Sequence, residues 1–405
     1  MVVASPKAGA RRHTQPSPLR LLTAVPVCDG HDSAVTTINL ELARNGAEVV
    51  YLGYHCAASA IARAAVQEDV HAVGLSSYNG GHAIFFAEVL AQLRARGAGD
   101  IPLFGGGGAT ITPADERVMK RGGVDRIFFA GTPLAEIVAA VKGAYSRELG
   151  PGARLRGDRA LGRAITLAEG GARGARAAGR ARGADRAGRA FVLGVAGPGG
   201  AGKSTLIDEL TSRFLRRVSA GRVAILANDP SHPDSGGAIL GDRVSAIYAQ
   251  DDRVFFRSMA TRGSPTGLSA AAPEAIACLR ASGEFDLVLV ESVGIGQEGD
   301  PFGVFGRGPR MADAVLFVLA PHYGGRIQLQ KIAMLNGSDL VALNKCDQPA
   351  AKAAMVEVAA RLALNGRDQL LHGTAAARHH DPGVDRLYAE IARLAGLEAV
   401  APGAR

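Results

Sequence analysis

Short apolar runs alternate with helix-period segments along most of the chain. In the first part the apolar runs are Leu19–Val25, Ala47–Leu52, Ala72–Ser76, Ile101–Phe104 and Arg126–Ala130, with helical patterns such as His82–Arg96 and Leu134–Arg147 between them. Strands separated by helices imply right-handed βαβ crossovers and therefore a parallel sheet. Residues 18–148 are predicted to form a flavodoxin-like (Rossmann-type) α/β domain, whose ligands bind at the carboxyl ends of the strands.

The same alternation returns over residues 191–396. The apolar runs here are Phe191–Ala196, Arg222–Ala227, Leu287–Glu291, Ala314–Ala320 and Leu340–Asn344. Continuous apolar strands are typical of a parallel sheet that helices cover on both faces, so a second α/β domain is predicted. Residues 149–190 are rich in Gly, Ala and Arg and are predicted to be a linker with one helix over Asp158–Glu169. Residues 1–17 are predicted to be disordered, and 397–405 to form a frayed tail.

The distribution of charge and the cysteine content limit the expected partners and the expected cellular compartment. The net charge is +8, but residues 151–190 carry ten Arg against three acidic residues, so the rest of the chain is near neutral. This distribution is typical of a solvated connector rather than a nucleic-acid groove. The four cysteines form no C-x-x-C pair, which favours a reducing compartment. With no secretory signal and no apolar run near the ~20 residues that cross a membrane, we expect a cytoplasmic protein that binds neither nucleic acid nor membrane.

A phosphate-binding loop follows the first strand of the second domain. Residues 197–204 read GPGGAGKS and match G-x-x-x-x-G-K-[ST], with a helix predicted from Ser204 to about Arg217. The glycines let backbone N–H groups surround phosphate oxygens, Lys203 reaches the β- and γ-phosphates, and Ser204 holds Mg²⁺. The predicted contacts are Gly197, Gly199, Gly200, Ala201, Gly202, Lys203, Ser204 and Thr205.

Other motifs favour GTP as the nucleotide. Residues 344–347 read NKCD after a strand and match N-K-x-D, in which Asp347 accepts hydrogen bonds from the guanine N1–H and amine that adenine cannot supply. The predicted base contacts are Asn344, Lys345 and Asp347, with Thr374 and Ala375. A P-loop kinase is the alternative, and ATP matching GTP as a substrate would support it.

Acidic residues follow or flank strands of the second domain. Glu291-Ser-Val-Gly294 ends a strand at the place of the GTPase D-x-x-G motif, so Glu291 is predicted to reach the metal through water. Asp229 and Asp242 bracket a glycine-containing loop that can order around the metal. Lys203 and Glu291 are the predicted catalytic residues, because in-line attack of water on the γ-phosphate requires the developing charge to be stabilised.

This half resembles the GTPase chaperones associated with methylmalonyl-CoA mutase. The resemblance rests on GPGGAGKSTLIDEL (197–210), DPSHPDSGGAILGDR (229–243), ESVGIGQ (291–297) and NKCD (344–347). It implies that Asp229, Asp242 and Glu291, with Ser204, attend Mg²⁺. The segment Glu298–Arg310 is longer than in that family, so switching or partner coupling is expected to differ there.

Histidine and glycine motifs follow the strands of the first domain. Asp29-Gly-His31-Asp32 follows the first strand, where a neutral imidazole can bind cobalt while Asp29 accepts its other N–H. SSYNGGH (76–82) follows the third strand and Gly105–Gly108 the fourth, leaving space for a large group close to the backbone. His82 is interpreted as a helix start. A flavin-type or a response-regulator-type domain, which would share this fold, is the alternative. Asp29 and Asp32 partly imitate the acidic residues of a phosphoacceptor site.

The combination resembles the cobalamin-binding domain of adenosylcobalamin mutases, with its D-x-H-x-x-G, S-x-L and GG motifs. Ala34 and Tyr78 depart from that pattern but suit the fused isobutyryl-CoA mutases, which read DGHDAA and SSYxGGH. The resemblance implies that His31 replaces the dimethylbenzimidazole of the cofactor as the lower cobalt ligand. The implied cofactor residues are Asp29, His31, Ser76, Tyr78, Gly80, Gly81, Gly106 and Gly107.

The order of the two halves resembles the N-terminal part of the fused isobutyryl-CoA mutases, in which an acyl-CoA-binding barrel follows. That barrel is absent from this sequence, so we expect no isomerisation of acyl-CoA by this chain alone. The expected function is a GTP-hydrolysing carrier and chaperone that loads adenosylcobalamin into a mutase barrel supplied in trans. A homodimer is expected by analogy. The alternative is a cobalamin-responsive GTPase regulator without a mutase client.

Overall fold

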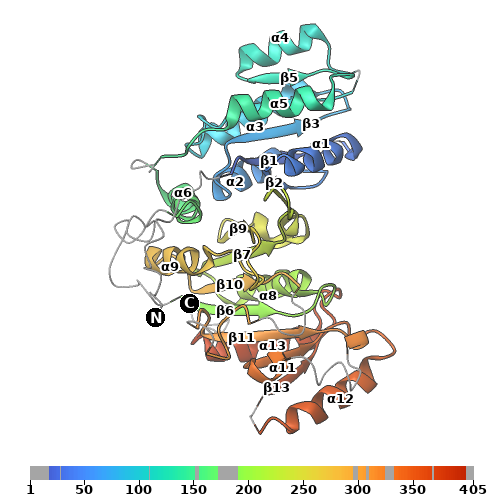
Figure 1. Cartoon of the computed structure of the whole chain (residues 1–405), viewed down its shortest axis with the longest axis vertical. Coiled ribbons are helices and arrows are strands. Elements are labelled where there is room, and N and C mark those ends of the chain that lie inside the picture. Colours follow the sequence, from blue (N-terminus) through green and yellow to red (C-terminus); the bar gives the residue numbers. More distant parts are fainter. Residues whose placement is uncertain are drawn as a thin grey trace, which may run out of the picture.

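The computed structural model describes residues 18–27, 29–108, 110–150, 155–171, 190–294, 300–306, 310–323, 333–366 and 369–397. Two parallel sheets, each flanked by helices, follow one another along the long axis of the molecule (Figure 1). The predicted disordered N-terminus, the predicted tail apart from Leu397, and residues 151–154 and 172–189 of the predicted linker lie outside the described residues. So do residues 298, 299 and 307–309 of the segment that is expected to be longer than in the family.

The first sheet has the predicted flavodoxin-like strand order. Its strand order is β5-β4-β3-β1-β2-β8, and its own five strands therefore run 2-1-3-4-5. The strands are β1 (Arg20–Ala24), β2 (Glu48–Tyr51), β3 (Ala72–Ser76), β4 (Leu103–Gly106) and β5 (Arg126–Phe128). The helices are α1 (Ser33–Arg44), α2 (Ala58–Gln67), α3 (His82–Ala95), α4 (Pro113–Gly122) and α5 (Leu134–Tyr145). His82 opens α3 as predicted.

The sixth strand of this sheet comes from the second half of the chain. Strand β8 (Ala238–Leu240) lies parallel to β2, with Glu48 opposite Ala238 and Val50 opposite Leu240. Val50, Ala238 and Leu240 are buried together. The loop between Asp229 and Asp242 is therefore ordered against the neighbouring domain, which the sequence did not predict.

The second sheet has the order β13-β12-β11-β6-β10-β7-β9, and every neighbouring pair is parallel. Its strands are β6 (Phe191–Ala196), β7 (Val223–Asp229), β9 (Val254–Ala260), β10 (Leu287–Glu291), β11 (Ala314–Leu319), β12 (Leu340–Leu343) and β13 (Leu370–Gly373). Its helices are α8 (Lys203–Arg217), α9 (Ala272–Ser282), α11 (Ala333–Gly337), α12 (Ala351–Ala363) and α13 (Pro382–Leu394), with short 3₁₀ turns η1 (Asp242–Ser245), η2 (Ile247–Gln250) and η3 (Pro321–Tyr323). The five predicted strands are present, and the edge strands β9 and β13 are additional.

Helix α6 (Gly157–Glu169) confirms the one helix predicted in the arginine-rich tract, but it is not a solvated connector. It lies between the two sheets in Figure 1. Ile165 is fully buried in the core of the second domain, while Arg159 binds both oxygens of Asp100 in the first domain at 2.6 Å. A side chain at Gly162 would come within 2.8 Å of the Gln67 carbonyl, so α6 approaches α2 closely. Among the described helices, none combines the length and hydrophobicity of a transmembrane span.

Candidate cofactor and nucleotide sites

The loop after β1 holds His31 in the orientation that a metal-binding histidine needs. Its Nδ1 lies 2.8 Å from Oδ1 of Asp29, and its side chain is 64% exposed, whereas that of Asp29 is fully buried. With Nδ1–H donated to Asp29, the Nε2 lone pair is free to bind a metal. The residues at this edge therefore fit a cobalamin that takes a histidine from the protein.

Asp29 is itself fixed by the loop after β3. Its Oδ1 accepts the His31 N–H at 3.0 Å, and its Oδ2 accepts the N–H groups of Tyr78 and, at 3.1 Å, of Asn79. Burial alone raises the pKa of Asp29, but these hydrogen bonds outweigh it and the net shift is downward. The Tyr78 ring stacks on His31 with 5.4 Å between centroids. Two of the predicted motifs thus meet in one cluster.

The predicted glycines differ in what they leave space for. At Gly106 and Gly107 a Cβ would lie 2.6 Å from the Phe128 carbonyl oxygen and 1.6 Å from that of Ser77, so neighbouring backbone requires glycine. At Gly80 and Gly81 a Cβ would meet nothing within 4 Å. Ser76 ends β3 and is 9% exposed. Gly106 and Gly107 thus allow neighbouring backbone to approach closely, whereas Gly80 and Gly81 leave open space at the edge of the sheet.

His55 is a residue of this edge that the sequence did not single out. It follows β2 with φ of 59°, its Nδ1 lies 2.9 Å from the Val27 carbonyl oxygen, and its ring lies 3.8 Å from the Cβ position of Gly30. Its position directly after a strand is where ligand-binding residues of this fold lie, but no sequence motif distinguishes His55 from an ordinary loop histidine.

The predicted phosphate loop joins β6 to α8. Gly202 caps α8 with φ of 89°, and a Cβ there would lie 2.4 Å from Nδ2 of Asn344, so glycine is required. Lys203 Nζ donates to the carbonyl oxygens of Gly197 and Pro198 at 3.2 and 3.3 Å. Tyr323, which the sequence analysis did not identify, donates its hydroxyl to the Gly199 carbonyl at 3.0 Å.

The predicted base-binding segments converge on the side chain of Asn344. Its Nδ2 donates to the Ala201 carbonyl at 3.0 Å, and its Oδ1 accepts from the Thr374 hydroxyl and the Ala376 N–H at 3.1 and 3.0 Å. Asn344 thus ties the phosphate loop to the segment after β13. Ala375 is buried, while Asp347, three residues after Asn344, is exposed. Lys345 takes a left-handed φ of 60°.

The three predicted magnesium carboxylates lie at the same sheet edge as Lys203. Ser204 donates its hydroxyl to Glu291 at 2.9 Å, and the Gly241 N–H donates to Asp229 at 3.1 Å. Burial raises the pKa of both Glu291 and Asp229, and the charge of nearby Asp242 raises each further.

A cation at this point would compensate these crowded carboxylates. Among the described residues, no three His, Cys, Asp or Glu side chains group closely enough to hold a metal ion. Mg²⁺ commonly uses one or two carboxylates together with phosphate oxygens and water, so Ser204 with one or two of Asp229, Asp242 and Glu291 fits a nucleotide-bound Mg²⁺.

Fold and geometry together define a two-domain protein of the P-loop GTPase class, with a cobalamin-type Rossmann-like domain before it. Residues 161–397 match the family described as "Methylmalonyl Co-A mutase-associated GTPase MeaB", and residues 19–139 match the B12 binding domain. The chain therefore belongs to the MeaB GTPase family and carries a B12 binding domain ahead of the GTPase. These matches confirm the fold class and the family predicted from the sequence.

Three curated relatives align with nearly the whole of the described two-domain chain. Proteins named "Fused isobutyryl-CoA mutase" are 36% identical over 91% of this chain in Cupriavidus metallidurans, 36% over 92% in Geobacillus kaustophilus and 37% over 97% in Nocardia farcinica. The aligned regions cover 35%, 36% and 38% of those relatives. The chain thus spans a little over a third of their length.

Proposed function

We propose that this chain is a GTP-hydrolysing carrier and chaperone of adenosylcobalamin that serves an acyl-CoA mutase barrel. The observation that carries the proposal is the exposed His31, oriented by a buried Asp29, in the same chain as a phosphate loop and an N-K-x-D segment. The likeness to fused isobutyryl-CoA mutases supports an acyl-CoA mutase as the client. We place the protein in the cytoplasm, in line with the free thiols of Cys56, Cys278 and Cys346.

The residues of the first domain bind and orient the cofactor in this proposal. His31 provides the imidazole Nε2, Asp29 holds its tautomer, and the open positions at Gly80 and Gly81 leave space beside the β3 loop. Bound adenosylcobalamin supplies radical chemistry through its Co–C bond. Because that chemistry needs a barrel that closes over the substrate, we propose that this chain alone does not isomerise acyl-CoA.

The residues of the second domain position GTP for in-line attack by water. Lys203 stabilises charge on the β- and γ-phosphates, and the phosphate-loop amides bind the same oxygens. Ser204, Asp229, Asp242 and Glu291 would hold Mg²⁺, which adds positive charge at the phosphates when bound. Asp347 selects guanine.

Addition of a mutase barrel tests the proposed role. The purified chain, preloaded with adenosylcobalamin, is mixed with the barrel polypeptide of a fused isobutyryl-CoA mutase, and phosphate release and the visible spectrum are followed. We expect faster GTP hydrolysis and transfer of cofactor to the barrel. Unchanged hydrolysis and no transfer, with no mutase barrel copurifying from the native source, would favour a cobalamin-responsive regulator instead.

A further inference from the structure

Between β7 and η1 the chain leaves the GTPase sheet and crosses to the other domain. We call residues 230–241 the crossing segment. It begins directly after Asp229 and ends directly before Asp242, and the hydrogen bond from the Gly241 N–H to Asp229 brings its two ends together. In its middle, β8 pairs with β2 of the cobalamin-binding domain. Both aspartates proposed for Mg²⁺ therefore flank a segment that the other domain holds.

Glu48 of the cobalamin-binding domain holds the first end through Arg262. The Arg262 backbone N–H donates to the Ser231 hydroxyl at 2.7 Å, two residues after Asp229. Its guanidinium Nε donates to Glu48 at 2.8 Å, and the Glu48 side chain is fully buried. Arg262 thus links Ser231 to a carboxylate at the start of β2.

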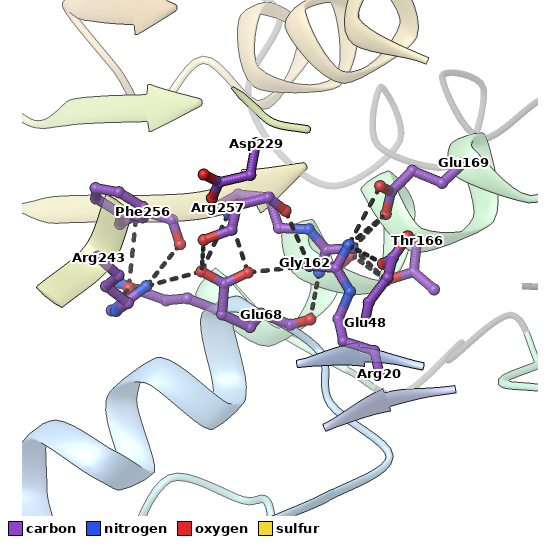
Figure 2. Close-up of polar contacts among 12 residues, drawn as sticks. Arg20, Glu48, Glu68, Gly162, Thr166, Glu169, Asp229, Arg243, Phe256 and Arg257 are labelled. Atoms are coloured by element: carbon purple, nitrogen blue, oxygen red, sulfur yellow. Dashed lines mark hydrogen bonds and ion pairs between the residues drawn. The ribbon is translucent and has the colours of Figure 1, made fainter. Parts of the chain in front are cut away.

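Glu68 holds the second end through Arg243, the residue that follows Asp242. The Arg243 guanidinium donates to Glu68 at 3.2 Å and to the Phe256 carbonyl at 2.9 Å. Figure 2 shows these residues together. It also donates to Gln67 at 2.6 Å, and its side chain is only 5% exposed. Glu68, fully buried, also accepts the Ser258 N–H at 3.0 Å. A buried guanidinium loses its solvation, so its partners fix its position tightly.

The middle of the crossing segment fits the first domain without spare space. The Ser235 hydroxyl and the Ala238 N–H donate to the carbonyls of Ala43 and Ala47 at 2.8 and 3.0 Å. A Cβ at Gly237 would lie 2.1 Å from the Ala43 oxygen and 2.7 Å from that of Ala47. Any side chain there would push β8 away from β2.

We propose that Glu48 and Glu68 of the cobalamin-binding domain are positioning residues for the metal-binding carboxylates of the GTPase. They act through Arg262 and Arg243 and through the pairing of β8 with β2. The proposal rests on the proposed function, because it assigns Asp229 and Asp242 to Mg²⁺. The contact extends to the cofactor edge, since Val244 lies 3.3 Å from the Cβ position of Gly53 in the loop that carries His55.

Two variants of the full chain test the proposal, each acting on a different contact. Glu68→Gln removes the charge that holds Arg243, and Gly237→Ala displaces β8 by steric overlap with the Ala43 carbonyl. Asp100→Asn is the control, because its partner Arg159 joins the domains through α6 rather than through the crossing segment. Thermal melting shows whether each variant is folded.

The readouts are the Mg²⁺ dependence of binding of a fluorescent, non-hydrolysable GTP analogue and the hydrogen exchange of the β8 amides. We expect both variants to need about 10-fold more Mg²⁺ for half-saturation, because loss of the residues that hold metal ligands in place weakens metal binding by about this much. The β8 amides of both variants should also exchange faster. Asp100→Asn should titrate as the wild type does. If one variant fails to fold, the Mg²⁺ dependence of the other still tests the proposal.

Wild-type Mg²⁺ dependence in a folded variant whose β8 amides exchange faster would overturn the positioning role. An equal shift in Asp100→Asn would also overturn it, because general loosening of the domain boundary would then suffice. Failure of the wild type to bind the GTP analogue at any Mg²⁺ concentration would instead contradict the proposed function.

Discussion

At the scale of single residues, the contact that orients His31 is local, whereas the contacts of Asn344 join distant parts of the chain. The carboxylate expected to hold His31 does so, because a histidine and an aspartate two residues apart on a strand-end loop can meet locally. Asn344 was predicted as a base contact, yet the bonds it makes here run between the phosphate loop and Thr374. Such long-range bonds leave no local trace in the sequence.

Asp347 belongs to this scale, because its carboxylate is exposed and a change there leaves the fold intact. Asp347→Asn should weaken GTP binding by about 100-fold, since hydrogen bonds to a charged acceptor contribute about 1.5–3 kcal/mol each. The same variant should favour xanthosine triphosphate, whose base presents an oxygen that the Asn amide can donate to. Competition binding with the two nucleotides checks this, and equal affinity of wild type and variant for GTP would contradict it.

At the scale of elements, strands β8 and β9 were not predicted from the sequence, because their contacts are with residues far away along the chain. In β9, Arg257 and Ser258 interrupt the apolar run, although both are buried because they bind Glu68. β8 has three residues, too few for a periodic signal, and its partner β2 lies about 190 positions earlier. Apolar strands such as β3 and β10, in contrast, are found at the predicted residues.

The glycine run after β4 gives a prediction at this scale. Gly107→Ala should destabilise the first domain by about 1–3 kcal/mol, because its Cβ would overlap the Ser77 carbonyl. Gly143→Ala is the matched control, since Gly143 lies in α5 with nothing within 4 Å of its Cβ position, and it should be neutral or stabilise by up to about 1 kcal/mol. Chemical unfolding measures both, and equal stability of the two variants would be inconsistent with the close approach.

At the scale of the whole molecule, buried ion pairs join the two domains. Glu169 at the end of α6 contacts Arg20 of β1 and Arg257 of β9, and Figure 2 shows the three together. A buried charge without a partner would destabilise the folded protein, so each domain supplies charges that compensate those of the other. Glu169, an acidic residue of the arginine-rich tract, is therefore part of the domain boundary.

Glu169 makes the stability of this boundary depend on pH. Burial alone raises its pKa, but the guanidinium groups, led by that of Arg20, lower it to about 2. Because the folded pKa lies below the unfolded value, its stabilising contribution is complete above about pH 4.5 and is lost as pH falls toward 2. Glu169→Gln should destabilise the protein by about 3–5 kcal/mol at neutral pH and flatten this acid dependence. Urea unfolding of the wild type and of Glu169→Gln from pH 2 to 7 measures this. The same pH dependence of the free energy of unfolding in both proteins would contradict the prediction.

The most direct test of the central claim is a visible-spectrum titration of adenosylcobalamin with wild type, His31→Ala and His55→Ala. His55 is the matched histidine at the same edge, bonded to the Val27 carbonyl rather than to a carboxylate. We predict a shift to the base-off, histidine-coordinated spectrum with wild type and His55→Ala, and its loss in His31→Ala. No spectral change with the wild type, or the same shift with His31→Ala, would contradict the assignment of this chain as a cobalamin carrier.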